Sequence, residues 1–204
     1  MNVLDISPVI PVVVIDDEAD AVPLARALVA GGIGVIEVTL RTPTALESIR
    51  RIAAEVPEIV VGAGTILAPA HAVDAADAGA AFLVSPGTTP TVLAAMVDTG
   101  LPLLPGCATI TEAMTLREQG HTQLKFFPAE AAGGASYLKG IAGPVPDLRF
   151  CPTGGITLER VPAYLALPNV TCVGGTWIAP ASAISARDWD GITTTAAETL
   201  AACR

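Results

Sequence analysis

A lysine in an apolar run is the residue of this chain best suited to covalent chemistry. The 204 residues include two lysines, and one of them, Lys125, has Leu124, Phe126 and Phe127 beside it. Burial disfavours the charged form of an amine, and a neutral lysine amine attacks carbonyl carbons to form imines. The alternative is a structural role, in which Lys125 is paired with a buried carboxylate. The other lysine, Lys139, is expected at the surface.

Polar and apolar residues alternate from Glu37 to Arg41, with Thr39 between them. Side chains alternate between the two faces of a strand, so these three would share one face while the intervening apolar residues pack on the other. A carboxylate and a guanidinium on the same side as Lys125 would supply an acid/base group and an anion-binding group. The alternative is a buried network in which Glu37 only neutralises Lys125 or Arg41.

Short β-branched runs alternate with alanine-rich helical segments along the whole chain, with a period of roughly two dozen residues. Strands are predicted at residues 9–15, 35–40, 59–65, 81–85, 101–105, 123–127, 148–152 and 170–173. Helices are predicted at residues 18–30, 44–55, 70–78, 91–99, 111–119, 158–166 and 188–202. Eight βα units predict a parallel sheet covered by helices on its outer face.

This arrangement predicts an α/β fold, a single (β/α)8 TIM barrel that spans residues 1–204 as one domain. The competing architecture is a doubly wound open sheet. Its dinucleotide-binding form has a glycine-rich turn after the first strand, whereas here Ile15 is followed by Asp16 and Asp17, and glycine first appears at Gly31. The barrel is therefore favoured.

Glycine pairs follow the last two predicted strands, at Gly154–Gly155 and Gly174–Gly175. Active sites of such barrels lie at the carboxyl ends of the strands, and bare backbone there donates N–H groups to phosphate oxygens. Thr153, Thr157 and Thr176 add nearby hydroxyls. A single glycine pair usually indicates only a tight turn, but two pairs at matching strand ends favour a phosphate site.

Composition argues against several classes of function. The formal net charge of -9 argues against nucleic acid and anionic membrane surfaces as partners, and the longest apolar runs are too short to cross a bilayer. The four cysteines form no C-x-x-C pair, and His71 and His121 lie far apart, so neither a metal nor a disulfide is expected. The first residues lack the basic segment of a secretory signal, which predicts a cytoplasmic location.

Five segments, taken together, closely resemble the 2-keto-3-deoxy-6-phosphogluconate (KDPG) aldolases, metal-independent class I aldolases that also act on 4-hydroxy-2-oxoglutarate (KHG). The segments are residues 37–41, 61–65, 85–87, 125–130 and 152–156. The most specific of them is Lys125-Phe126-Phe127-Pro128-Ala129-Glu130. The likeness covers nearly the whole chain, although relatives often begin with a helix that covers the barrel bottom, where this chain has eight residues before its first predicted strand.

The resemblance implies that Lys125 forms the imine and that Glu37 is the general acid/base. It also implies a set of substrate-binding residues. The carboxylate would be held by Arg41 and Thr65, the apolar walls would be Pro86 and Phe127, and the phosphate site would comprise Gly154, Gly155, Gly174, Gly175 and Thr176.

The implied reaction cleaves KDPG, a phosphorylated 2-keto acid, into pyruvate and glyceraldehyde 3-phosphate, with no cofactor and no metal. Activity on KHG and a homotrimeric assembly are also implied. Three alternatives remain open: an aldolase for the galactonate-derived epimer or for unphosphorylated analogues, a phosphosugar isomerase or epimerase that uses Glu37 as its base, and a non-catalytic barrel in which Lys125 and Glu37 are only an ion pair.

Overall fold

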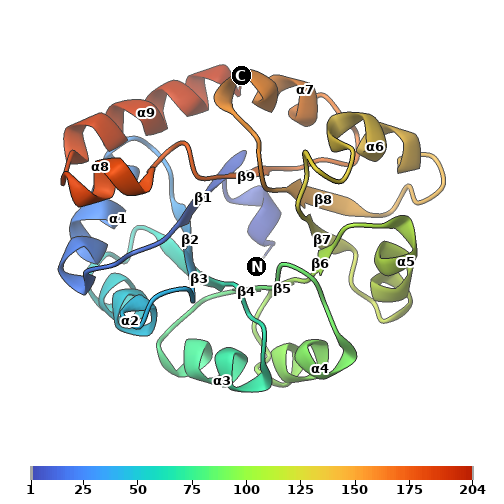
Figure 1. Ribbon diagram of the computed structural model, residues 1–204, viewed down its shortest axis with the longest axis horizontal. Helices are drawn as coiled ribbons and strands as arrows, with labels where there is room; N and C mark the ends of the chain where they lie inside the picture. The colour runs from blue at the N-terminus through green and yellow to red at the C-terminus, as the bar shows by residue number, and fades with distance from the viewer. Residues whose placement is uncertain (1, 204) are drawn as a thin grey trace.

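The computed structural model describes residues 2–203, in which buried apolar runs form parallel strands ringed by helices (Figure 1). The strands are β1 (Val9–Val13), β2 (Val35–Thr39), β3 (Val60–Gly64), β4 (Leu83–Val84), β5 (Leu103–Leu104), β6 (Gly106–Cys107), β7 (Gln123–Phe126), β8 (Arg149–Pro152) and β9 (Val173–Gly175). The helices are α1 (Ala21–Ala30), α2 (Ala45–Glu55), α3 (Pro69–Asp77), α4 (Pro90–Asp98), α5 (Ile110–Glu118), α6 (Gly134–Ile141), α7 (Val161–Leu165), α8 (Ala181–Ser185) and α9 (Trp189–Ala202). Three short 3-10 helices are η1 (Val3–Asp5), η2 (Glu18–Asp20) and η3 (Leu158–Arg160).

The strands close into a barrel. One sheet has the order β5-β4-β3-β2-β1-β9 and the other β6-β7-β8, with every pairing parallel. Isolated parallel bridges from Phe150 to Val170 and from Thr153 to Gly174 join β8 to β9. Pro105 separates β5 from β6, because proline has no N–H to give to a ladder. Counted as one strand, β5 and β6 complete the eight strands of the predicted (β/α)8 barrel.

Side chains that point outward from the strands pack against the helices. Phe126 of β7 stacks on Tyr137 of α6 with ring centroids 5.4 Å apart, and it meets Phe150 of β8 edge-on at 6.4 Å. All three rings belong to the core or pack against it. Because Phe126 faces outward, the alternation of side chains directs its neighbour Lys125 into the barrel.

Two predicted features of the C-terminal half are wrong. The last strand is β9, which pairs with β1 at residues 173–175, so Gly174 and Gly175 are strand residues and not a loop after the strand. The predicted helices also omit α6 and α8. The glycines at the start of α6 disguise it, because Gly133 and Gly134 have φ of 107° and 62°, while α8 is only five residues long.

The bottom of the barrel is closed by the short segment that precedes β1. In Figure 1 this segment lies near the axis of the ring, and its Val3 and Leu4 are buried in the hydrophobic core. The one turn of η1 therefore packs its apolar side chains into the core at this end of the barrel. Within residues 2–203, none of the helices has the length and apolar character needed to cross a membrane.

Candidate active site

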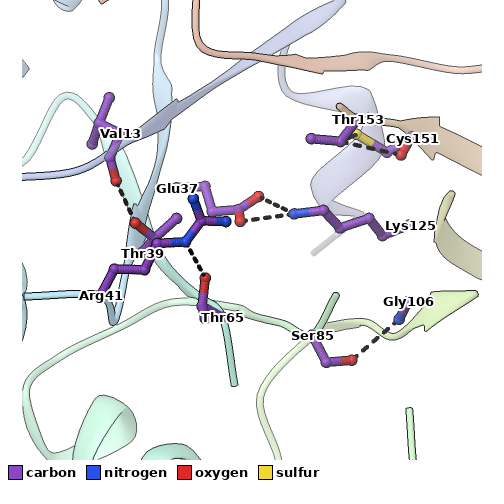
Figure 2. Close-up of polar contacts among 10 residues, drawn as sticks. All are labelled: Val13, Glu37, Thr39, Arg41, Thr65, Ser85, Gly106, Lys125, Cys151 and Thr153. Carbon is purple, nitrogen blue, oxygen red and sulfur yellow. Dashed lines mark hydrogen bonds and ion pairs between the residues drawn. The ribbon is translucent and has the colours of Figure 1, made fainter. Parts of the chain in front are cut away.

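A buried ion pair joins the two residues singled out for covalent and acid/base chemistry. Lys125 of β7 donates from Nζ to Oε1 and Oε2 of Glu37 at 2.9 and 3.2 Å, across the inside of the barrel (Figure 2). Glu37 is 3 % exposed and Lys125 5 %. Glu37 therefore lies on the interior face of β2, as the alternation of polar and apolar residues predicts. The fold brings it into contact with Lys125, which is 88 residues away in the sequence.

The neighbouring strand makes room for the Glu37 carboxylate. Gly64 of β3 pairs with Thr39, and a Cβ on Gly64 would collide with the Oε1 and Cδ atoms of Glu37. A side chain at position 64 would push the carboxylate away from Lys125. Thr39, which is fully buried, donates its hydroxyl to the carbonyl of Val13 and so ties β2 to β1 at the same level.

Arg41 and Thr65 lie together at the mouth of the barrel. Arg41 Nε donates to Thr65 Oγ1 at 3.2 Å (Figure 2). Thr65 has φ of 63°, in a region that β-branched residues rarely adopt and that costs about 1–3 kcal/mol. Strain of this kind tends to occur at functional sites, where the surrounding structure enforces it.

A pocket of about 220 Å³ opens above the ion pair. Seven of the predicted catalytic and substrate-binding residues line it: Arg41, Lys125, Phe127, Gly154, Gly155, Gly174 and Thr176. The Phe127 ring centroid is 5.7 Å from Lys125 Nζ, which makes it an apolar wall beside the amine. The pocket therefore combines one guanidinium, one buried amine and a large share of bare backbone.

The turn after β8 presents backbone donors to this pocket. Gly154 and Gly155 have φ of 105° and 76°, a conformation that glycine adopts without strain. Among the hydrogen bonds of residues 2–203, none uses the backbone N–H of Gly154, Gly155 or Thr176 as donor. Free N–H groups beside a hydroxyl are suited to an anion such as a phosphate.

Three of the predicted substrate-binding residues, Thr65, Pro86 and Gly175, are not part of the pocket lining. Gly175 faces the Trp177 ring, which a Cβ at that position would overlap. Pro86 follows β4, and its backbone packs closely against Gly106, the register partner of Lys125. Glu37 also lies outside the lining, but Glu37 and Thr65 are each bonded to a residue within it.

Three residues without a predicted site role also line the pocket. Val12 of β1 and Ile156 contribute apolar surface, and Thr153 contributes its hydroxyl close to Gly174. The continuous apolar run of β1 gave no sign that Val12 faces inward, because strands buried on both faces lack alternation.

Metal ligands are not gathered at this site. Within residues 2–203, no group of three or more histidine, cysteine, aspartate or glutamate side chains is arranged to hold a metal ion. The groups present at the mouth are an amine, a carboxylate, a guanidinium and backbone donors. An amine and a carboxylate in contact are sufficient for imine formation with proton transfer.

A (β/α)8 barrel with a buried lysine–glutamate pair at its mouth has the architecture of an imine-forming barrel enzyme. The family model described as "KDPG and KHG aldolase" matches residues 1–195. The KHG/KDPG aldolase of Escherichia coli K12 is 49 % identical over 199 residues, which cover 98 % of this chain and 93 % of that protein.

Two solved structures are also similar. One is the KDPG aldolase of Legionella pneumophila with pyruvate captured as a covalent carbinolamine; its TM-score is 0.94, with 47 % identity over 97 % of this chain and 96 % of that one. The other is the KDPG aldolase of Zymomonas mobilis ZM4 with 3-phosphoglycerate; its TM-score is 0.92, with 47 % identity over 97 % of this chain and 93 % of that one. The chain belongs to the KDPG and KHG aldolase family and is a carbon–carbon lyase.

Proposed function

We propose that this chain cleaves KDPG to pyruvate and glyceraldehyde 3-phosphate through an imine on Lys125, with Glu37 as the acid/base. The observation that carries the proposal is the contact of the Lys125 amine with both carboxylate oxygens of Glu37 below an open pocket. At 2.9 Å, Glu37 is within range to take the ammonium proton and leave a nucleophilic amine.

The first half of the reaction forms the imine. The neutral amine of Lys125 attacks the C2 ketone, and a proton moves to the former carbonyl oxygen, which gives a carbinolamine. Glu37 protonates the hydroxyl of this carbinolamine, and water leaves as the nitrogen lone pair forms the C=N bond. The product is a positively charged iminium, which withdraws electrons from the neighbouring C3–C4 bond.

The second half breaks the carbon–carbon bond. The carboxylate of Glu37, directly or through water, removes the proton of the C4 hydroxyl; the C3–C4 electron pair moves into the iminium, and glyceraldehyde 3-phosphate leaves. The enamine that remains takes at C3 the proton that Glu37 removed, directly or through water, which restores the carboxylate. Water then adds to the iminium and releases pyruvate and the free amine. The water lost in the first half is regained here, so the cycle needs no co-reactant.

The remaining residues bind the two charged ends of the substrate. Arg41, in contact with Thr65, is placed to hold the carboxylate, and its planar guanidinium offers two parallel donors. Phe127 is an apolar wall for the pyruvyl part, and we assign Pro86 to the same part because its backbone packs against Gly106, the register partner of Lys125.

The phosphate end fits the turn after β8. The free N–H groups of Gly154, Gly155 and Thr176 support a phosphate there, with Gly174 as bare surface. We place Gly175 behind this surface, as packing for Trp177. The Zymomonas relative was solved with 3-phosphoglycerate, a phosphorylated acid, which agrees with this assignment.

A coupled assay of pyruvate release tests the proposal. The wild-type chain should release pyruvate from KDPG in the presence of a metal chelator, and also from KHG, as the name of the Escherichia coli relative suggests. The galactonate-derived epimer, offered in parallel, measures the stereochemical preference at C4. Isomerisation or epimerisation of a phosphosugar without pyruvate release would overturn the proposal.

We also infer that the chain forms a homotrimer in the cytoplasm. Exposed apolar side chains on consecutive βα units support self-association, and free thiols fit a reducing compartment. The exposed residues are Leu67, Val73, Val97 and Met114. Light scattering should give three times the 20.6 kDa chain mass, and a monomer mass would contradict the trimer.

A further inference from the structure

Glu130 follows the lysine strand and holds the glycine turn of the pocket from outside. Ala129 and Glu130 donate their backbone N–H groups to the carbonyls of Thr153 and Gly154 at 2.8 and 3.1 Å, which continues the β7–β8 ladder beyond both strands. Gly155 lies against the Glu130 side chain, since a Cβ there would be 3.0 Å from Glu130 Cβ. One residue thus lies against the turn with both its backbone and its side chain.

The carboxylate of Glu130 is bonded to the segment on the other side of the turn. Tyr164 of α7 donates its hydroxyl to Glu130 Oε1 at 2.6 Å, and Arg160 of η3 donates to Oε2. Tyr164 is 1 % exposed, and burial raises the pKa of its hydroxyl, so this group remains a donor at neutral pH. Glu130 therefore connects the residues before the turn to the residues after it.

We propose that Glu130 and Tyr164 are positioning residues that set the distance between the imine-forming lysine and the phosphate-binding turn. This inference rests on the proposed function, because it needs a substrate held at both Lys125 and the turn. Glu130 is five residues after Lys125 and bonded directly to Gly154, so its place fixes the relative position of the two ends. A displaced turn weakens the hold on a phosphate but leaves the amine, Glu37 and Arg41 in place.

Tyr164 should contribute more to this positioning than Arg160. The Arg160 side chain is 58 % exposed, and ion pairs at the surface contribute little because water and salt screen them. The Tyr164 hydroxyl is held by a buried ring and donates to a charged acceptor, which makes a stronger bond. Loss of the Tyr164 hydroxyl should therefore impair substrate binding more than loss of the Arg160 side chain.

The test compares KDPG with KHG, which lacks the phosphate, in wild type and in Tyr164→Phe. We expect the KM for KDPG to rise about threefold to tenfold in Tyr164→Phe, which is the effect that loss of one typical hydrogen bond would have on binding. The kcat/KM for KHG should stay within about twofold of wild type. Glu130→Ala should show the same split more strongly, Glu130→Gln should recover part of the loss because its amide oxygen still accepts from Tyr164, and Arg160→Ala should show little change.

Tyr137→Phe is the matched control. The Tyr137 hydroxyl accepts the N–H of Ile110, the first residue of α5, at 2.7 Å, so this variant loses a tyrosine hydrogen bond that is not made to Glu130. We expect its KM values for both substrates to match wild type. Equal losses on both substrates in Tyr164→Phe, or no loss on KDPG, would overturn the positioning role. Failure of the wild type to cleave either substrate would instead overturn the proposed function.

Discussion

At the scale of single residues, the Lys125–Glu37 pair places two opposite charges in the barrel interior. Their side chains are 6 % and 4 % exposed, so each charge depends on the other to offset the loss of hydration. A buried pair of this kind adds little net stability, but removal of one partner leaves an uncompensated charge. The pair is therefore better explained by chemistry than by stability.

This explanation predicts a specific pattern of stability. Lys125→Met should lower the free energy of unfolding by about 3–5 kcal/mol, because Glu37 is left buried without its partner. The same variant should abolish aldol cleavage, because it lacks the amine that forms the imine. The double variant Lys125→Met/Glu37→Gln should regain much of the stability but none of the activity. Urea denaturation of the single and double variants gives their free energies of unfolding. Lys139→Met, at an exposed position, is the control and should change stability by less than about 0.5 kcal/mol. Additive losses in the double variant would contradict the pairing.

The strained backbone of Thr65 gives a second test. Thr65→Ala and Thr65→Gly both lose the hydroxyl that Arg41 contacts, but only glycine suits φ of 63°. We expect Thr65→Gly to be more stable than Thr65→Ala by about 1 kcal/mol. At Thr194, an exposed position within α9, the order should reverse, because glycine weakens a helix. Thermal unfolding of Thr65→Ala, Thr65→Gly, Thr194→Ala and Thr194→Gly measures these differences. If the alanine variant were the more stable one at both positions, Thr65 would not be strained.

At the scale of elements, β6 is the strand that supports the lysine. Lys125 donates its N–H to the carbonyl of Pro105 at 3.0 Å, and Phe127 donates to that of Cys107 at 3.0 Å. Cys107 is 2 % exposed, and burial, with a smaller contribution from Glu112, raises the pKa of its thiol to about 12. This short strand therefore holds a thiol that stays protonated in the folded chain.

The raised pKa predicts a loss of stability at alkaline pH. Between pH 9 and pH 12 the unfolded chain releases the Cys107 proton while the folded chain keeps it, so unfolding becomes more favourable as the pH rises. Relative to Cys107→Ala, wild type should lose up to about 1.4 kcal/mol per pH unit in this window, with no pH-dependent difference below it. Denaturant titrations at several pH values give the two curves, and parallel curves above pH 9 would refute the shift.

The pattern of the elements could largely be predicted from sequence, and the exceptions have local causes. The apolar runs and their period predict the eight strands and seven of the helices, and the alternation around Glu37 predicts that this side chain faces the barrel interior. The break at Pro105 and the start of α6 at Gly134 depend on backbone geometry that composition does not show. The end of β9 depends on its pairing with β1, a contact between distant parts of the chain.

At the scale of the whole molecule, barrel closure makes the site from residues that are far apart in sequence. The pocket is lined by residues of β1, β7 and β9 and of the segments after β2 and β8. Its lining residues extend in sequence from Val12 to Thr176. The residue types with evident chemistry could be predicted, because few side chains form imines or hold carboxylates. Val12 and the Glu130–Tyr164 contact could not, because their roles follow only from the closed ring.

The most direct measurement is reduction of the chain with borohydride in the presence of pyruvate, followed by peptide mapping. We expect the mass of one reduced pyruvyl group on the peptide that contains Lys125, no addition at Lys139, and no addition when pyruvate is absent. An unchanged protein mass, or a label on Lys139 in place of Lys125, would contradict the central claim that Lys125 is the imine-forming residue.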